Sequence, residues 1–274
     1  MIQHAMVFLS LATVTTLLYL AAAIALGARL LLYEDRSPAR STALALGAAA
    51  VGAHVVVVAE TTWVEGGVNL GFFSALSLVS WITSTGLVIA SLRQRVEHLG
   101  ILLWPLSAMA VALTPFAPPA EATLSRDPAL GVHIVLSMLA YSTLLAAVLQ
   151  ALILALLDHR LRTRRATGFV RQLPALRAME KQLFWLITVG FIALTVALGS
   201  GFLFFMDRLL DGAMIHKTSL SIASWVAFAT LLAGHAIWGW RGQTAIRWTL
   251  VGFLALMLGY FGSKFVLELI LQRR

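Results

Sequence analysis

The chain has 274 residues, of which 60% are hydrophobic and 12% are charged. Globular chains are about 45–50% apolar and about 25% charged, so this composition excludes an ordinary soluble domain, a disordered chain, a coiled coil and collagen. The sequence has no cysteine, which excludes disulfides and thiolate metal sites, and its formal net charge is +8.

Eight stretches are long and apolar enough to cross a bilayer, which takes about 20 mostly apolar residues. They cover residues 6–30, 42–62, 69–91, 99–118, 132–157, 183–206, 218–240 and 248–270. Because backbone polar groups must be satisfied inside lipid, we expect helices and no strands. The sequence therefore predicts an all-α, polytopic membrane protein that forms a single integral membrane domain over residues 1–274.

The basic residues are distributed unevenly over the loops between these stretches. Fourteen fall in one set of loops: Arg29, Arg36, Arg40, Arg93, Arg95, Arg160, Arg162, Arg164, Arg165, Arg171, Arg177, Lys181, Arg241 and Arg247. Five fall in the opposite set: Arg126, Arg208, Lys217, Arg273 and Arg274. The positive-inside rule then predicts that both termini lie outside and the basic loops in the cytoplasm. The positive charge is a topology signal that needs no nucleic-acid partner, and the lipid bilayer is the expected surrounding.

Three histidines fall within the apolar stretches, where ionisable groups are costly and therefore suggest function. His54 lies inside the second stretch, His133 opens the fifth, and His235 lies near the inner end of the seventh. Neutral imidazole is a common ligand of metals and haem iron. The alternative for His54 is tight helix packing, with its imidazole bonded to a neighbouring hydroxyl. Of the other four histidines, His4, His98 and His159 are expected to be solvated, and His216 lies at the outer start of the seventh stretch.

Other residue patterns bear on the chemistry. Zinc is disfavoured because no two histidines stand at i, i+4 spacing. Lys264 and Glu268 have that spacing, which predicts an ion pair. Trp225 is deep enough in its stretch to stack on a planar ligand, although packing alone would also explain it. Few carboxylates lie at membrane depth, so the sequence favours a binding or assembly protein over an enzyme and gives no catalytic residue.

Three stretches together resemble the cytochrome c assembly protein family. Residues 131–142 resemble the start of a family helix that opens with His-Val, here at His133. Residues 217–225 resemble a family helix that begins Lys-Glu-Thr-Trp and ends in a histidine, here His235, and a Trp-x-Gly turn. Residues 259–262, Gly-Tyr-Phe-Gly, resemble the Phe-Phe-Gly of the last helix. The likeness is best over 131–270, and the short HemX/YpjD-like branch is the most similar.

This resemblance implies a haem-handling protein of the bacterial inner membrane. It makes His133 the outer ligand of haem iron and His235 the membrane-embedded ligand, with His54 a further ligand in the HemX/YpjD-like branch and Trp225 beside the cofactor. The implied partners are haem and other membrane or cytochrome-biogenesis proteins.

One departure from the family supports a second hypothesis. Residues 204–212 contain no tryptophan, where the family has a tryptophan-rich haem-binding signature. The alternative is a haem-free membrane scaffold or regulator that docks a partner through the basic loop 158–181. A solute transporter is the third class, and the sequence shows neither inverted repeats nor broken helices in its favour.

Overall fold

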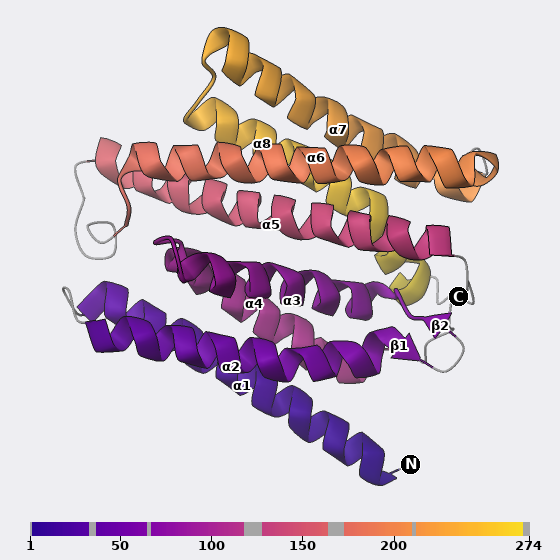
Figure 1. The fold of residues 1–274 in the computed structure, drawn as a ribbon, viewed down its shortest axis with the longest axis horizontal. Helices are drawn as coiled ribbons and strands as arrows, with labels where there is room; N and C mark the ends of the chain where they lie inside the picture. The colour runs from indigo at the N-terminus through magenta and orange to yellow at the C-terminus, as the bar shows by residue number, and fades with distance from the viewer. Residues whose placement is uncertain are drawn as a thin grey trace. The chain divides into compact units, whose positions relative to one another are not determined.

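The computed structural model describes residues 2–32, 37–64, 67–117, 128–163, 173–209 and 212–270. Within these ranges eight helices are long and apolar enough to cross a membrane, which confirms the predicted all-α polytopic fold (Figure 1). They group into two compact units, α1 to α4 and α5 to α8. The side of the membrane on which the termini lie stays a prediction.

The first unit contains α1 (Ile2–Leu32), α2 (Ser37–Thr62), α3 (Phe72–Ser91) and α4 (Gly100–Leu113). Two 3₁₀ turns flank α4, η1 (Glu97–Leu99) and η2 (Thr114–Phe116). α1 packs on α2 and α4, and α3 packs on the same two helices, so the four helices close into a ring. The packing of α2 on α4 depends on Gly47, since a Cβ there would lie 2.5 Å from the buried indole of Trp104.

A short hairpin follows α2, where no strand was predicted. β1 (Trp63–Val64) pairs antiparallel with β2 (Gly67–Val68), and the side-chain amide of Asn69 donates to the Thr61 carbonyl at 3.0 Å. Two residues a strand are too few to show a period-two hydrophobic pattern, so the sequence gives no signal for them.

Charged side chains close the opposite end of the first unit. The carboxylate of Glu97 accepts from Arg40 Nε at 2.9 Å and from Arg29 Nη1 at 3.4 Å. Arg40 Nη2 also donates to the Ser91 carbonyl at 2.8 Å. These bonds connect α1, α2 and the end of α3 to η1. His98, which follows Glu97, is buried rather than solvated as predicted, because η1 folds back under the helices.

The second unit contains α5 (Pro128–Arg162), α6 (Leu176–Leu209), α7 (Gly212–Trp238) and α8 (Gln243–Met257). It closes in the same cyclic order, with α5 on α6 and α8, and α7 on the same two helices. Glycines again permit close contact: a Cβ at Gly190 of α6 would lie 2.6 Å from the Leu144 side chain of α5. Buried polar groups bond between helices, as where Gln150 Nε2 donates to the Met179 carbonyl at 3.0 Å.

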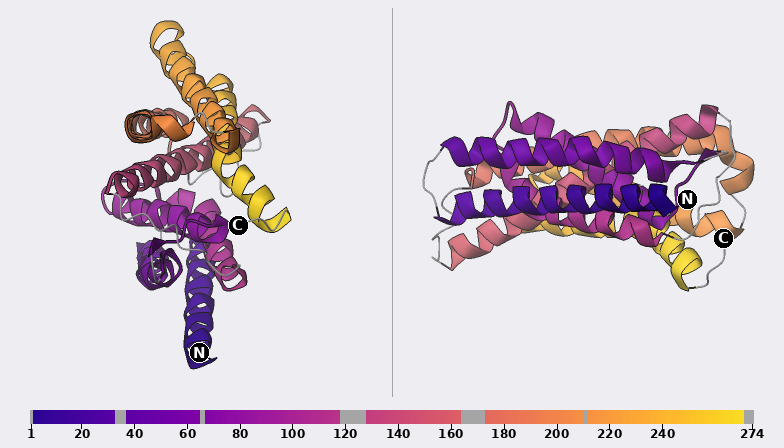
Figure 2. Two further views of the ribbon diagram at one scale, coloured as in Figure 1. Left: turned by 90° about the vertical axis from the view of Figure 1, so that its right-hand side faces the viewer. Right: turned by 90° about the horizontal axis from the view of Figure 1, so that it is seen from below.

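α8 continues into two π-helical segments, η4 (Leu258–Gly262) and η5 (Phe265–Ile270), so that the chain stays helical to the end of the last apolar stretch (Figure 2). The Tyr141 hydroxyl of α5 donates to the Leu256 carbonyl just before this transition, at 2.9 Å. The predicted ion pair between Lys264 and Glu268 is confirmed, with Nζ 3.0 Å from the carboxylate.

Candidate functional site

His54 lies at the centre of a hydrogen-bonded network in the first unit. Its side chain is fully buried, with Nδ1 3.0 Å from the Tyr19 hydroxyl of α1 and Nε2 2.9 Å from the Ser77 hydroxyl of α3. The Tyr19 hydroxyl has Ser84 as a further partner, and the Ser84 and Ser107 hydroxyls lie 2.9 Å apart. A neutral imidazole has one N–H and one lone pair, and both are used here. Iron could bind His54 only after one of these bonds broke.

His133 is bonded to α6 through its Nδ1. Its Nδ1 lies 2.9 Å from the Ser200 hydroxyl, which itself donates to the Ala197 carbonyl at 2.7 Å. Because the single hydroxyl proton of Ser200 is used there, its oxygen accepts from His133, and Nδ1 carries the imidazole proton. The lone pair of the ring is therefore on Nε2. Gly201 makes room for this imidazole, since a Cβ there would lie 3.3 Å from its Cε1.

His235 is held in the same tautomer by the backbone. Its Nδ1 lies 2.7 Å from the Trp240 carbonyl oxygen, which can only accept, so Nδ1 carries the proton and Nε2 the lone pair. One face of the ring stacks on Phe184 of α6, with centroids 3.6 Å apart and an interplanar angle of 18°. Histidines that bind metal usually donate their other ring N–H to a carbonyl or carboxylate in this way, which fixes the ring and raises its basicity.

The turn between α7 and α8 supplies that carbonyl. Gly239 ends α7 with a φ of +67°, a conformation that favours glycine at this position. The Trp240 indole then folds back over Gly234, where a Cβ would lie only 2.3 Å from the ring. The Trp240 indole also stacks on Trp238 and on Trp248, with ring centroids 5.6 and 5.9 Å apart. These aromatic rings therefore pack around the C-terminal end of α7, where His235 lies.

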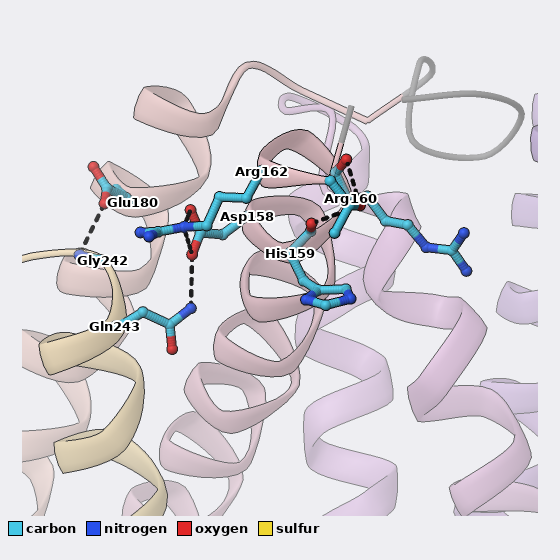
Figure 3. Close-up of polar contacts among 8 residues, drawn as sticks. Asp158, His159, Arg160, Arg162, Glu180, Gly242 and Gln243 are labelled. Carbon is cyan, nitrogen blue, oxygen red and sulfur yellow. Dashed lines mark hydrogen bonds and ion pairs between the residues drawn. The ribbon is translucent and has the colours of Figure 1, made fainter. Parts of the chain in front are cut away.

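Two acidic side chains from neighbouring helices bind this turn and the start of α8 (Figure 3). Glu180 Oε1 of α6 accepts from the Gly242 backbone N–H at 3.0 Å. Asp158 Oδ2 of α5 accepts from Gln243 Nε2 at 2.7 Å, and the same carboxylate accepts from Arg162 at 3.1 Å.

Trp225 lies away from His235. It stands ten residues before His235 on α7, about 15 Å along the helix axis. Its indole N–H donates to the Thr195 hydroxyl at 2.9 Å, and its ring lies 5.4 Å from that of Phe191. These contacts join Trp225 of α7 to α6, and its place beside a cofactor stays a prediction.

His133 and His235 are far apart in the second unit. Their contacts on α6, Ser200 and Phe184, are sixteen residues apart, which is about 24 Å along a helix. The two imidazoles therefore cannot bind one iron. Over the described ranges no three or more histidine, aspartate or glutamate side chains come together as a metal site, so the arrangement offers separate single imidazoles instead.

Sequence reasoning missed the residues that fix these rings. Ser200 lies in the Gly-Ser-Gly segment 199–201, a sequence that is typical of a helix-packing or kink site. Glu180 and Phe184 stand at i and i+4 near the start of α6, and neither shows a pattern of its own. The Trp-x-Gly turn at 240–242 was the one sequence signal for the partner of His235, because such a turn can direct a backbone carbonyl toward the end of the preceding helix.

The fold and these histidines define a class of protein: polytopic helical membrane proteins with single, hydrogen-bonded imidazoles near the ends of their helices. The chain belongs to the cytochrome c assembly protein family, whose model matches residues 41–271.

Two relatives extend the comparison. The chain is 35% identical to the inner membrane protein YpjD of Escherichia coli strain K12 over 207 residues, which are 75% of this chain and 78% of that protein. It is 30% identical over 241 residues to an uncharacterized 28.8 kDa protein of Azospirillum brasilense, encoded in a nifR3-like 5′ region, covering 84% and 85% of the two chains. No solved structure matches the chain.

Proposed function

We propose that this protein binds haem in the bacterial inner membrane and acts in cytochrome c assembly, with His133 and His235 as iron ligands at two separate sites. Family membership and the likeness to an inner membrane protein support the setting. The observation that carries the proposal is the 2.7 Å bond from His235 Nδ1 to the Trp240 carbonyl. It leaves the Nε2 lone pair as the metal-binding atom of the ring.

The residues around His235 fit a haem group. Phe184 covers one face of the imidazole, and the tryptophans of the α7–α8 turn make its surroundings aromatic and apolar. An apolar, planar macrocycle prefers such a lining, and its iron prefers neutral imidazole. Haem would supply the iron and its redox chemistry, whereas the chain binds, orients and shields it.

His133 forms the second site by an equivalent arrangement. Its Nδ1–H is directed to the Ser200 hydroxyl, so in this tautomer Nε2 is the nitrogen whose lone pair would bind iron. Since the two rings contact opposite halves of α6, they suit two haem-binding sites, one near each membrane surface. A protein that receives haem at one of these sites and presents it at the other would act as an assembly factor without a catalytic residue of its own.

His54 enters this proposal only conditionally. Its two nitrogens bond Tyr19 and Ser77, so binding iron would break one of these bonds. An unchanged spectrum in His54→Ala would assign it to packing of the first unit.

The test is the absorption spectrum of protein purified from haem-replete cells. We expect a Soret band that weakens in His133→Ala and in His235→Ala, and that disappears in the double variant. His159→Ala is the matched control, because this residue is exposed at the end of α5. Absence of the band in wild type, or an unchanged band in the double variant, would refute the proposal.

The second candidate, a haem-free scaffold or regulator, is supported by exposed basic residues at the edges of loop 158–181, including Arg160 and Lys181. Residues 164–172 of this loop lie outside the described ranges. Reversing the charges of Arg160 and Lys181 should then abolish capture of a membrane partner while the spectrum stays unchanged. A phenotype that depends on the histidines alone would exclude this candidate.

A further inference from the structure

The carbonyl that orients His235 belongs to a turn rather than to a helix. The Trp240 oxygen stands between Gly239 at φ +67° and Gly242 at φ +56°, both in conformations that few other residues adopt. Glycine also has more alternative conformations than other residues. The direction of this carbonyl therefore depends on whatever holds the turn in place.

Backbone bonds fix only the first part of the turn. The Gly239 N–H donates to the His235 carbonyl at 3.1 Å, and the Trp240 N–H donates to the Gly234 carbonyl at 3.2 Å. On the other side, α8 begins when the Ile246 N–H donates to the Gly242 carbonyl at 3.0 Å. The Gly242 N–H itself precedes the helix and so has no partner within it.

Glu180 supplies that partner. Its Oε1 accepts from the Gly242 N–H at 3.0 Å and so connects the second half of the turn to α6 (Figure 3). A carboxylate is well suited to this position, because the first N–H groups of a helix carry partial positive charge.

The same face of α6 also holds the imidazole. Phe184 stands four residues after Glu180, so the two side chains lie one turn apart on one face of the helix. Phe184 stacks on the His235 ring at 3.6 Å, while Glu180 holds the turn whose carbonyl bonds Nδ1 of that ring. One helix thus fixes both the plane of the imidazole and the partner of its proton.

We propose that Glu180 is a positioning residue for His235, acting through the Gly242 N–H and the Trp240 carbonyl to keep Nε2 as the ligand atom. This inference rests on the proposed function, since it takes His235 as the ligand. Asp158 is an accessory contact, because its bond to Gln243 lies beyond the turn, at the start of α8.

Three substitutions separate the hydrogen bond from charge and from shape. Glu180→Gln keeps an oxygen acceptor at the same reach and removes the charge. Glu180→Asp keeps the charge and shortens the side chain by one methylene. Glu180→Leu keeps the approximate shape and removes the acceptor. If the hydrogen bond positions the turn, Glu180→Gln behaves as wild type and the other two do not.

The first readout needs no haem. In haem-free protein labelled with ¹⁵N-histidine, the His235 resonance is assigned by its loss in His235→Ala. We expect a protonated Nδ1 and an unprotonated Nε2 in wild type and in Glu180→Gln. We expect both tautomers in Glu180→Asp and Glu180→Leu.

The second readout is the release of haem to an excess of apomyoglobin. Loss of an outer-shell partner typically weakens metal sites by about 10- to 100-fold, so Glu180→Asp should release the His235-bound haem about tenfold faster. Haem bound at His133 serves as the internal control and should not change. If Glu180→Leu fails to fold, the Gln and Asp variants still decide the matter.

Two results would overturn the inference: wild-type tautomer and release in Glu180→Asp, or a Glu180→Gln variant that behaves like Glu180→Asp. The second would mean that an oxygen acceptor at the reach of glutamate is not sufficient, so the hydrogen bond to Gly242 would not explain the role of Glu180. A wild-type protein without His235-dependent haem would refute the proposed function instead. The tautomer comparison would still test the role of Glu180.

Discussion

Gly234→Ala tests whether the α7–α8 turn is packed as described. A Cβ at this position would lie 2.3, 2.5 and 2.8 Å from three atoms of the Trp240 indole. Ordinary van der Waals contact begins at 3.4 Å, so the ring would have to retreat by more than 1 Å. The ring is rigid and its residue lies in a turn fixed at both ends, so this movement must displace the Trp240 carbonyl as well.

The expected cost follows from two opposing effects. Overpacking a well-packed site costs about 1–3 kcal/mol. Alanine is a better helix former than glycine by about 1 kcal/mol, which offsets part of this cost. Gly199→Ala is the matched control, because it lies in α6 of the same unit and a Cβ there meets nothing within 4 Å. We therefore expect Gly234→Ala to be less stable than Gly199→Ala by about 2 kcal/mol.

The assay is unfolding of detergent-solubilised protein by SDS titration, followed by tryptophan fluorescence. Gly234→Ala should shift the transition to lower denaturant, whereas Gly199→Ala should leave it unchanged or raise it slightly. Equal transitions for the two variants would refute the close packing of Trp240 on Gly234, and with it the fixed carbonyl on which His235 depends.

Three further predictions concern the first unit, each measured by the same unfolding assay. Gly47→Ala should lower stability by about 1–3 kcal/mol, because its Cβ would clash with the buried indole of Trp104. Gly52→Ala on the same helix has open space and should not lower stability. Equal effects of the two substitutions would contradict this packing. Tyr19→Phe leaves a buried nitrogen of the His54 imidazole unpaired and should cost about 1–3 kcal/mol. A Tyr19→Phe variant as stable as wild type would contradict this prediction. Glu97→Gln removes the counter-ion of two partly exposed arginines and should cost about 1–3 kcal/mol; no change would show that the cluster is solvated.

The sequence predicts the spans well because lipid allows few alternatives. An apolar stretch of about 20 residues in a bilayer must be a helix, so composition alone gives eight of them. The Lys264–Glu268 pair was predictable for a related reason, since both residues lie on one helix face and need no knowledge of its neighbours.

The environments of the histidines were harder to predict because they depend on which helices are adjacent. His54 bonds hydroxyls on α1 and α3, which are 35 and 23 residues away, and hydrophobic periodicity does not give the order of helices in a ring. The predicted surface position of His98 failed because a 3₁₀ turn folds a loop under the bundle. Glu180 acts on a backbone N–H 62 residues away, and no residue pattern marks such a contact.

The most direct test of the central claim is the number of haem groups bound by each chain, measured by pyridine haemochrome absorbance against protein concentration. Two separate single-histidine sites predict two haem groups in wild type at saturation. They predict one in His133→Ala, one in His235→Ala and none in the double variant. A ratio of one in wild type that falls to zero in either single variant would contradict the account, because the two imidazoles would then share one iron.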